Sequence, residues 1–78
     1  MIREMDMVVL THDVPKHNLQ KDDVGVIVHC YPKNLAYEVE FVTAEGTTVA
    51  LLTLTSADIR PIADREILHV REVAPAVV

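Results

Sequence analysis

The chain has 78 residues, half of them apolar, which is enough for one small domain with a modest core. It carries 12 acidic residues against 7 basic ones, a formal net charge of −5. This balance argues against nucleic acid and anionic membranes as partners, because phosphate contacts need clustered lysine and arginine. The single cysteine, Cys30, cannot form a disulfide within the chain. With no signal-peptide pattern and no membrane-spanning apolar run, we expect a cytoplasmic protein.

The apolar pattern has the period of β-strands over most of the chain. A short strand is expected at residues 7–11. A polar loop follows at 12–23, where Pro15 argues against both helix and central strand. Leu19 is the only strongly apolar residue between Pro15 and Val24, and we expect it to plug one end of a barrel.

The run at residues 24–31 is the strongest strand signal. It is dense in β-branched residues and largely apolar on both faces, which predicts a strand buried on both sides, as in a small barrel. Gly25 is expected at a bend or at a close approach of two backbones. A turn is expected at 32–34.

The segment 36–43 alternates cleanly, with Glu38 and Glu40 at the positions that point to water. The side chains expected in the core are Tyr37, Val39 and Phe41. A hairpin turn at 44–47 contains Gly46, which can take a positive φ. It should lead to a further strand at 48–54.

The chain then predicts a 3₁₀ turn at 55–58 and a short closing strand at 59–62, which Pro61 confines to a sheet edge. We therefore predict an all-β fold, a small SH3-like barrel of about five strands in residues 1–62. Residues 63–78 form a C-terminal extension. Its segment 67–73 is expected as an extra strand, paired with the barrel or exchanged with another subunit, or as part of a short helix. Its last residues, 74–78, are expected to fray.

No catalytic or metal site is evident, and we expect no cofactor. The four histidines are His12, His17, His29 and His69. They lack the close His or Cys pairs of zinc sites, and neighbouring strand residues such as His29 and Cys30 point to opposite faces. Cys30 lies among aliphatic residues, which is typical of an unreactive thiol rather than a nucleophile.

A protein partner fits the pattern better. Glu38, Glu40 and Glu45 would form an acidic stripe suited to a basic partner. Small apolar-rich domains also tend to self-associate, so a homodimer is expected as well. The residues expected to contact a partner are Glu38, Glu40, Glu45, Tyr31, Ile67 and Val70.

The runs at 6–15, 23–29, 36–41 and 59–61, with Leu19 and Leu54, resemble a family of short bacterial proteins classed as a domain of unknown function. The resemblance spans about residues 5–62. Members commonly carry a glycine where this chain has Asp22, and Asp also tolerates a positive φ. The resemblance implies an SH3-like barrel, distantly similar to the barrel domain of the nitrile hydratase β subunit, with no established activity.

Together these observations predict a non-enzymatic protein-interaction module. Its role would be that of an accessory subunit or an antitoxin- or immunity-like protein, binding itself or a partner encoded by a neighbouring gene. The alternatives are a nucleic-acid-linked regulator, by analogy with other small barrels, and a small enzyme or ligand-binding subunit.

Overall fold

The computed structural model describes residues 2–73. It contains five strands and two short 3₁₀ helices. In chain order these are β1 (Met7–Leu10), η1 (Pro15–His17), β2 (Val24–Cys30), η2 (Pro32–Asn34), β3 (Tyr37–Val42), β4 (Thr48–Leu54) and β5 (Ile59–Pro61).

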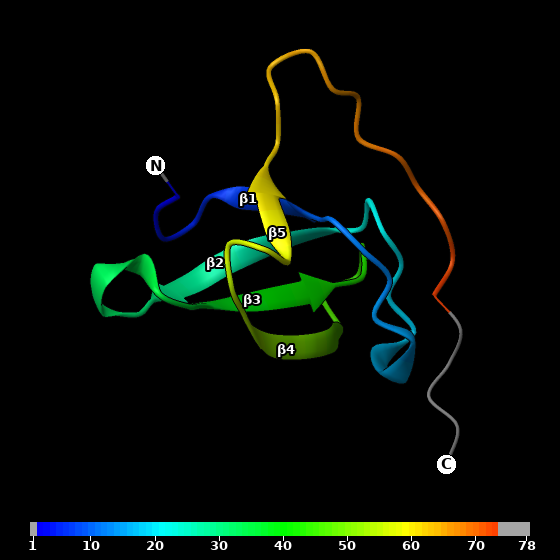
Figure 1. The fold of residues 1–78 in the computed structure, drawn as a ribbon. Coiled ribbons are helices and arrows are strands. Elements are labelled where there is room, and N and C mark those ends of the chain that lie inside the picture. Colours follow the sequence, from blue (N-terminus) through cyan, green and yellow to red (C-terminus); the bar gives the residue numbers. More distant parts are fainter. Residues whose placement is uncertain (1, 74–78) are drawn as a thin grey trace.

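The strands form one antiparallel sheet in the order β4-β3-β2-β1-β5. In Figure 1, β5 passes in front of β2, so the sheet curls over on itself. The two edges differ: β5 has three residues and ends in a proline, whereas β4 has seven. The predicted all-β class with about five strands is confirmed.

The core lies on one side of this curled sheet and draws on every strand. Tyr37, Val39 and Phe41 are all buried, as their alternation predicts. The other core residues are Val8, Leu10, Leu19, Ile27, Ala50, Leu54 and Ile59. The prediction that β2 is buried on both faces is wrong: Val28 and His29 are exposed, and a register shift lies between Ile27 and His29.

The first long loop folds back so that Leu19 reaches the core. Val14 and Leu19 exchange two backbone hydrogen bonds, with N···O distances of 2.9 and 3.2 Å, which close the loop around η1. The Leu19 side chain is only 3% exposed and belongs to the core cluster. Leu19 therefore packs into the core, although it lies in a loop.

Three backbone positions follow the expectations drawn from the sequence. Asp22 has φ of 77° and Gly46 has φ of 92°, both in the left-handed region. Gly25 lies against β3: a Cβ built on it would stand 2.7 Å from Val39 Cγ1 and 2.8 Å from Phe41 Cε1. The absence of a side chain at this position lets β2 pack against the core.

The C-terminal extension differs from the expected extra strand or short helix. Residues 62–73 contain a turn at 64–65 and neither helix nor strand. They rise from β5 in an arch and descend beside the first long loop (Figure 1). The expectation for residues 74–78 falls outside the described residues. Within residues 2–73, no helix has the length and apolar character needed to cross a membrane.

Candidate partner-binding surface

The face of the sheet opposite the core brings three of the predicted contact residues together. Glu38 pairs with His29 on β2 and with Thr53 on β4, and Glu40 pairs with Val26 and with Leu51. Because side chains alternate along a strand, Glu38 and Glu40 share this outward face. Their half-buried state places them on the surface of the sheet rather than in its interior.

Hydrogen bonds from uncharged hydroxyl groups hold the two carboxylates in place. Glu38 Oε1 accepts a hydrogen bond from the Tyr31 hydroxyl at 3.1 Å and another from the Thr53 hydroxyl. Glu40 Oε2 accepts one from Thr48 Oγ1 at 2.7 Å. The bond to Glu38 raises the pKa of Tyr31, because the carboxylate favours the protonated phenol. The side chains of Glu38 and Glu40 are thus oriented by uncharged donors.

The carboxylates of this face have no basic side chain paired with them in residues 2–73. Among the described residues, Glu38, Glu40 and Glu45 form no ion pair with a lysine or arginine. Glu45 lies in the exposed turn between β3 and β4 rather than on a strand. The predicted stripe therefore consists of two fixed carboxylates on β3 and a third at the end of the hairpin.

Apolar side chains that the sequence analysis did not single out accompany the carboxylates. Met7 on β1 pairs with Val26 on β2, which pairs with Glu40, which pairs with Leu51 on β4. Met7 is 43% exposed and Leu51 is 56% exposed. The alternation of side chains along each strand could have identified Met7, Val26 and Leu51 as outward-facing, but not as neighbours. We call Tyr31, Glu38, Glu40, Met7, Val26 and Leu51 the acidic sheet face.

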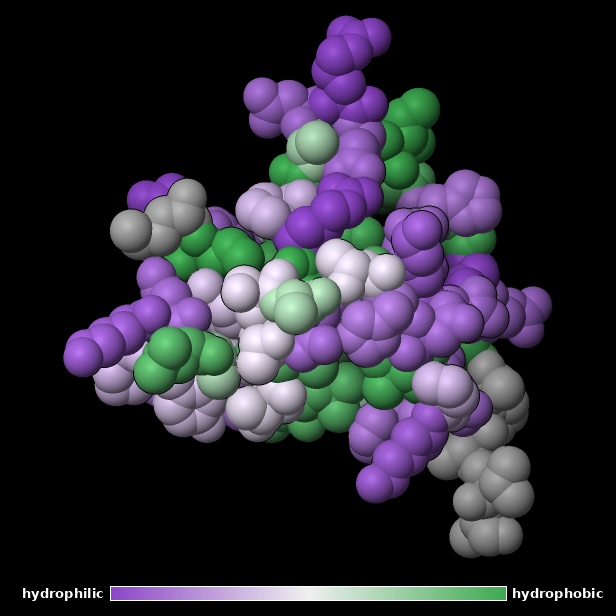
Figure 2. Space-filling model, viewed as in Figure 1, coloured by the Kyte–Doolittle hydropathy of each residue, from purple (hydrophilic) through white to green (hydrophobic). Residues whose placement is uncertain are grey.

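Ile67 and Val70 belong to a separate surface on the C-terminal extension. They are 92% and 88% exposed, and Leu68 beside them is 55% exposed. Figure 2 shows hydrophobic atoms at the surface in the upper part of this segment, next to hydrophilic ones. The structure thus divides the six predicted contact residues between the sheet with its β3–β4 turn and the extension.

Two ion pairs fix the extension on either side of these apolar residues. Arg60 donates two hydrogen bonds of 2.7 Å to the Glu66 carboxylate, which also accepts one from the Ala63 backbone N–H. These bonds lower the pKa of Glu66 to about 2. At the other end, Arg71 forms a two-pronged pair with Asp23 and donates to the Asn18 carbonyl.

The Arg71–Asp23 pair is the better shielded of the two. Partial burial of Asp23 opposes its ionisation, but the hydrogen bonds from Arg71 and from the Gln20 backbone N–H outweigh this effect and lower its pKa. Paired guanidinium and carboxylate groups of this geometry are among the stronger polar contacts in proteins. The Arg71–Asp23 pair therefore anchors the extension to the first loop.

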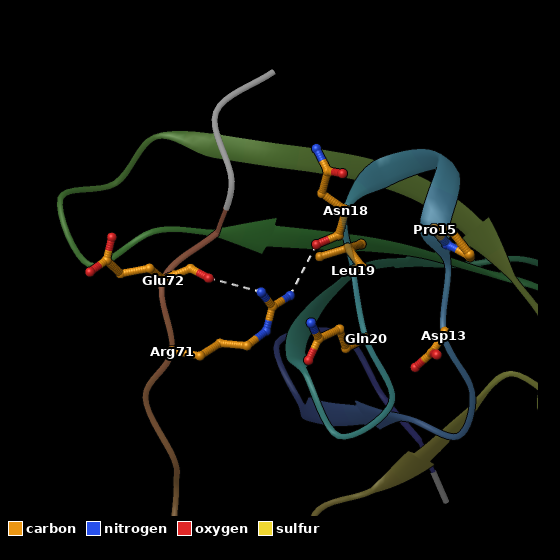
Figure 3. A pocket seen from close by; sticks show the side chains of 7 residues that line it. All are labelled: Asp13, Pro15, Asn18, Leu19, Gln20, Arg71 and Glu72. Carbon is orange, nitrogen blue, oxygen red and sulfur yellow. Dashed lines mark hydrogen bonds between the residues drawn. The ribbon is translucent and has the colours of Figure 1, made fainter. Parts of the chain in front are cut away.

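A shallow cavity of about 360 Å³ lies where the extension crosses the first loop (Figure 3). Asp13, Asn18 and Gln20 line it from the loop, and Arg71 and Glu72 line it from the extension. In Figure 3 the Arg71 guanidinium points across the gap to the Asn18 carbonyl. The cavity is open to solvent, and the cation that lines it, Arg71, is already paired with Asp23.

Among the described residues, no group of three or more metal-binding side chains occurs. His12 is bound on both sides: Nδ1 lies 2.9 Å from the Asp13 carbonyl and Nε2 lies 2.8 Å from Asp58 Oδ1. Both partners are acceptors, so the geometry favours the imidazolium and the pKa of His12 is raised, chiefly by Asp58. Cys30 is partly buried against the core.

Comparison with protein families identifies the chain. The family model for a domain of unknown function, DUF4926, matches residues 4–61. The chain belongs to this family. The match covers the five strands and ends at the last residue of β5, so the C-terminal extension lies beyond it. No curated protein and no solved structure matches the chain.

Proposed function

We propose that this DUF4926 protein is a non-enzymatic interaction module that binds a basic protein partner through the acidic sheet face. The observation that carries the proposal is the in-register placement of two uncompensated carboxylates beside exposed apolar side chains. The carboxylates are oriented by hydroxyl donors, so little side-chain entropy remains to be lost on binding.

The composition of this face suits a protein partner better than a small ligand. Protein interfaces combine an apolar centre with a polar rim and favour tyrosine and methionine. Here Met7, Val26 and Leu51 supply the apolar part, and Tyr31 lies beside Glu38. Lysine or arginine side chains of the partner would complete the hydrogen bonding of the two carboxylates, which would speed association at low salt.

The strand order supports the SH3-like barrel as the fold type of this domain. With that fold, the distant similarity to the nitrile hydratase β subunit that the sequence resemblance implies would favour an accessory-subunit role. The small size and acidic surface would also suit an antitoxin- or immunity-like protein that covers a basic partner. Both roles use the same face and the same chemistry, so one experiment addresses them.

The test is affinity capture from the native cells with three forms of the protein. The first is the wild type, and the second is Glu38→Gln/Glu40→Gln, which keeps the carbonyl acceptors for Tyr31 and the threonines but removes two charges. The matched control, Asp64→Asn/Glu72→Gln, removes two charges from the exposed extension instead. The proposal predicts a stoichiometric basic protein that the wild type and the control retain and the sheet variant loses. Equal capture by all three forms would refute it.

A further inference from the structure

The edge of β4 is unprotected. β4 is the outer strand of the sheet, and outside its ladder with β3 its residues make no backbone hydrogen bond to another described residue. Its sequence, Thr48–Leu54, contains no charged residue and no proline, which are the usual guards of a sheet edge. The opposite edge is guarded, because β5 is short and ends at Pro61. β4 is therefore the edge open to strand addition.

The C-terminal extension contains a segment whose unpaired backbone groups could pair with this edge. In residues 67–73 no backbone N–H or C=O forms a backbone hydrogen bond to another described residue. The segment equals β4 in length, and three of its apolar side chains, Ile67, Leu68 and Val70, are more than half exposed. The Arg60–Glu66 and Arg71–Asp23 pairs hold its two ends, which limits the entropy lost when it pairs.

We propose that two copies of this chain assemble by reciprocal strand addition, with residues 67–73 of each copy pairing along the β4 edge of the other. A two-fold axis relates the two contacts, so the assembly closes as a dimer. Leu51 on β4 would meet the apolar side chains on one face of the added segment, because neighbouring strand residues point to opposite faces. This assembly uses the edge of the sheet and shares Leu51 with the acidic sheet face, but it does not depend on the partner proposed for that face.

The buried area favours the extension over a second β4 as the occupant. Burial of Ile67, Leu68 and Val70 removes roughly 300 Å² of apolar surface per copy, at about 100 Å² for each side chain. Two copies bury about 600 Å² in this way, and the surfaces that they cover lose about as much. The total is then about 1,200 Å², the lower limit of a specific interface. Direct pairing of two β4 edges would cover only Leu51 among the strongly exposed apolar side chains of that strand, well short of that limit.

The experiment is sedimentation velocity over a range of protein concentrations with four forms of the full chain. The wild type should dimerise. The segment variant, Ile67→Asp/Val70→Asp, and the edge variant, Leu51→Lys, should each raise the dimer dissociation constant at least tenfold. The control, Leu35→Asp, changes a 72%-exposed leucine outside both elements and should leave it unchanged. Thermal unfolding of each form confirms that it is folded, as expected for substitutions at exposed positions.

Sedimentation of a mixture of the segment and edge variants is the decisive measurement. In the mixed dimer the intact segment of the edge variant pairs with the intact β4 of the segment variant, and the second contact sets the introduced aspartates beside the introduced lysine. The mixture should therefore associate more tightly than either variant alone. Glu38→Gln/Glu40→Gln should dimerise like the wild type. A monomeric wild type, a dimer that persists in the segment variant, or a mixture that associates no better than its components would each overturn the proposal.

Discussion

Gly25→Ala tests how tightly β2 packs against β3. The new methyl group would stand 2.7 Å from Val39 Cγ1 and 2.8 Å from Phe41 Cε1, whereas carbon atoms prefer separations of about 3.5–4.0 Å. Val39 is fully buried and Phe41 is 3% exposed, so neither can move without disturbing the core. Overpacking of this kind costs about 1–3 kcal/mol. The stiffer unfolded chain offsets about 0.4–1 kcal/mol of that cost, which leaves a net loss of about 1.3 kcal/mol at the midpoints of the two ranges.

Urea denaturation followed by far-ultraviolet circular dichroism measures this loss. The second variant is Val39→Ala, which removes Cγ1, the atom nearest to the methyl group that Gly25→Ala introduces. If the steric account is correct, Gly25→Ala should be less harmful in the Val39→Ala background, and the double-mutant cycle should show favourable coupling. A Gly25→Ala protein as stable as the wild type, or costs that simply add, would refute the reasoning.

Three further predictions concern the first loop and can be checked by the same denaturation experiment. Leu19→Ala should cost about 2–4 kcal/mol because it empties the end of the core, and a loss below about 1 kcal/mol would contradict its role as a plug. Asp22→Gly should stabilise the protein by about 0.5 kcal/mol, because glycine adopts positive φ without strain; a clear loss would contradict this. His12 has a raised pKa in the folded state, so the stability that it contributes is complete below its unfolded pKa of 6.5 and disappears as pH rises through the higher folded pKa. The stability difference between the wild type and His12→Gln should therefore shrink at alkaline pH, and a constant difference would refute the His12–Asp58 assignment.

The features that the sequence predicted well are local ones. Alternation placed Tyr37, Val39 and Phe41 in the core, and glycine and aspartate marked the positions of unusual backbone geometry. Leu19 was identifiable because it stands out as apolar in a polar loop. In each case the physical cause acts within a few residues of the chain.

The features that the sequence did not reveal depend on distant or irregular contacts. Arg71 and Asp23 are 48 residues apart, and no local pattern indicates that they pair. The irregularity between Ile27 and His29 changes which β2 residues face the core, and alternation alone cannot locate such a shift. The apolar part of the acidic sheet face depends on cross-strand register, which combines three separate strand pairings.

The most direct test of the proposed function is methyl nuclear magnetic resonance of the protein titrated with the partner obtained by affinity capture. Met7, Val26 and Leu51 carry methyl groups on the acidic sheet face, while Ile27 and Val39 carry matched methyl groups on the buried side. Binding through this face should shift the methyl signals of the first three residues and leave those of Ile27 and Val39 nearly unchanged. Shifts confined to residues of the first loop and the extension, with Met7, Val26 and Leu51 unaffected, would contradict the proposal.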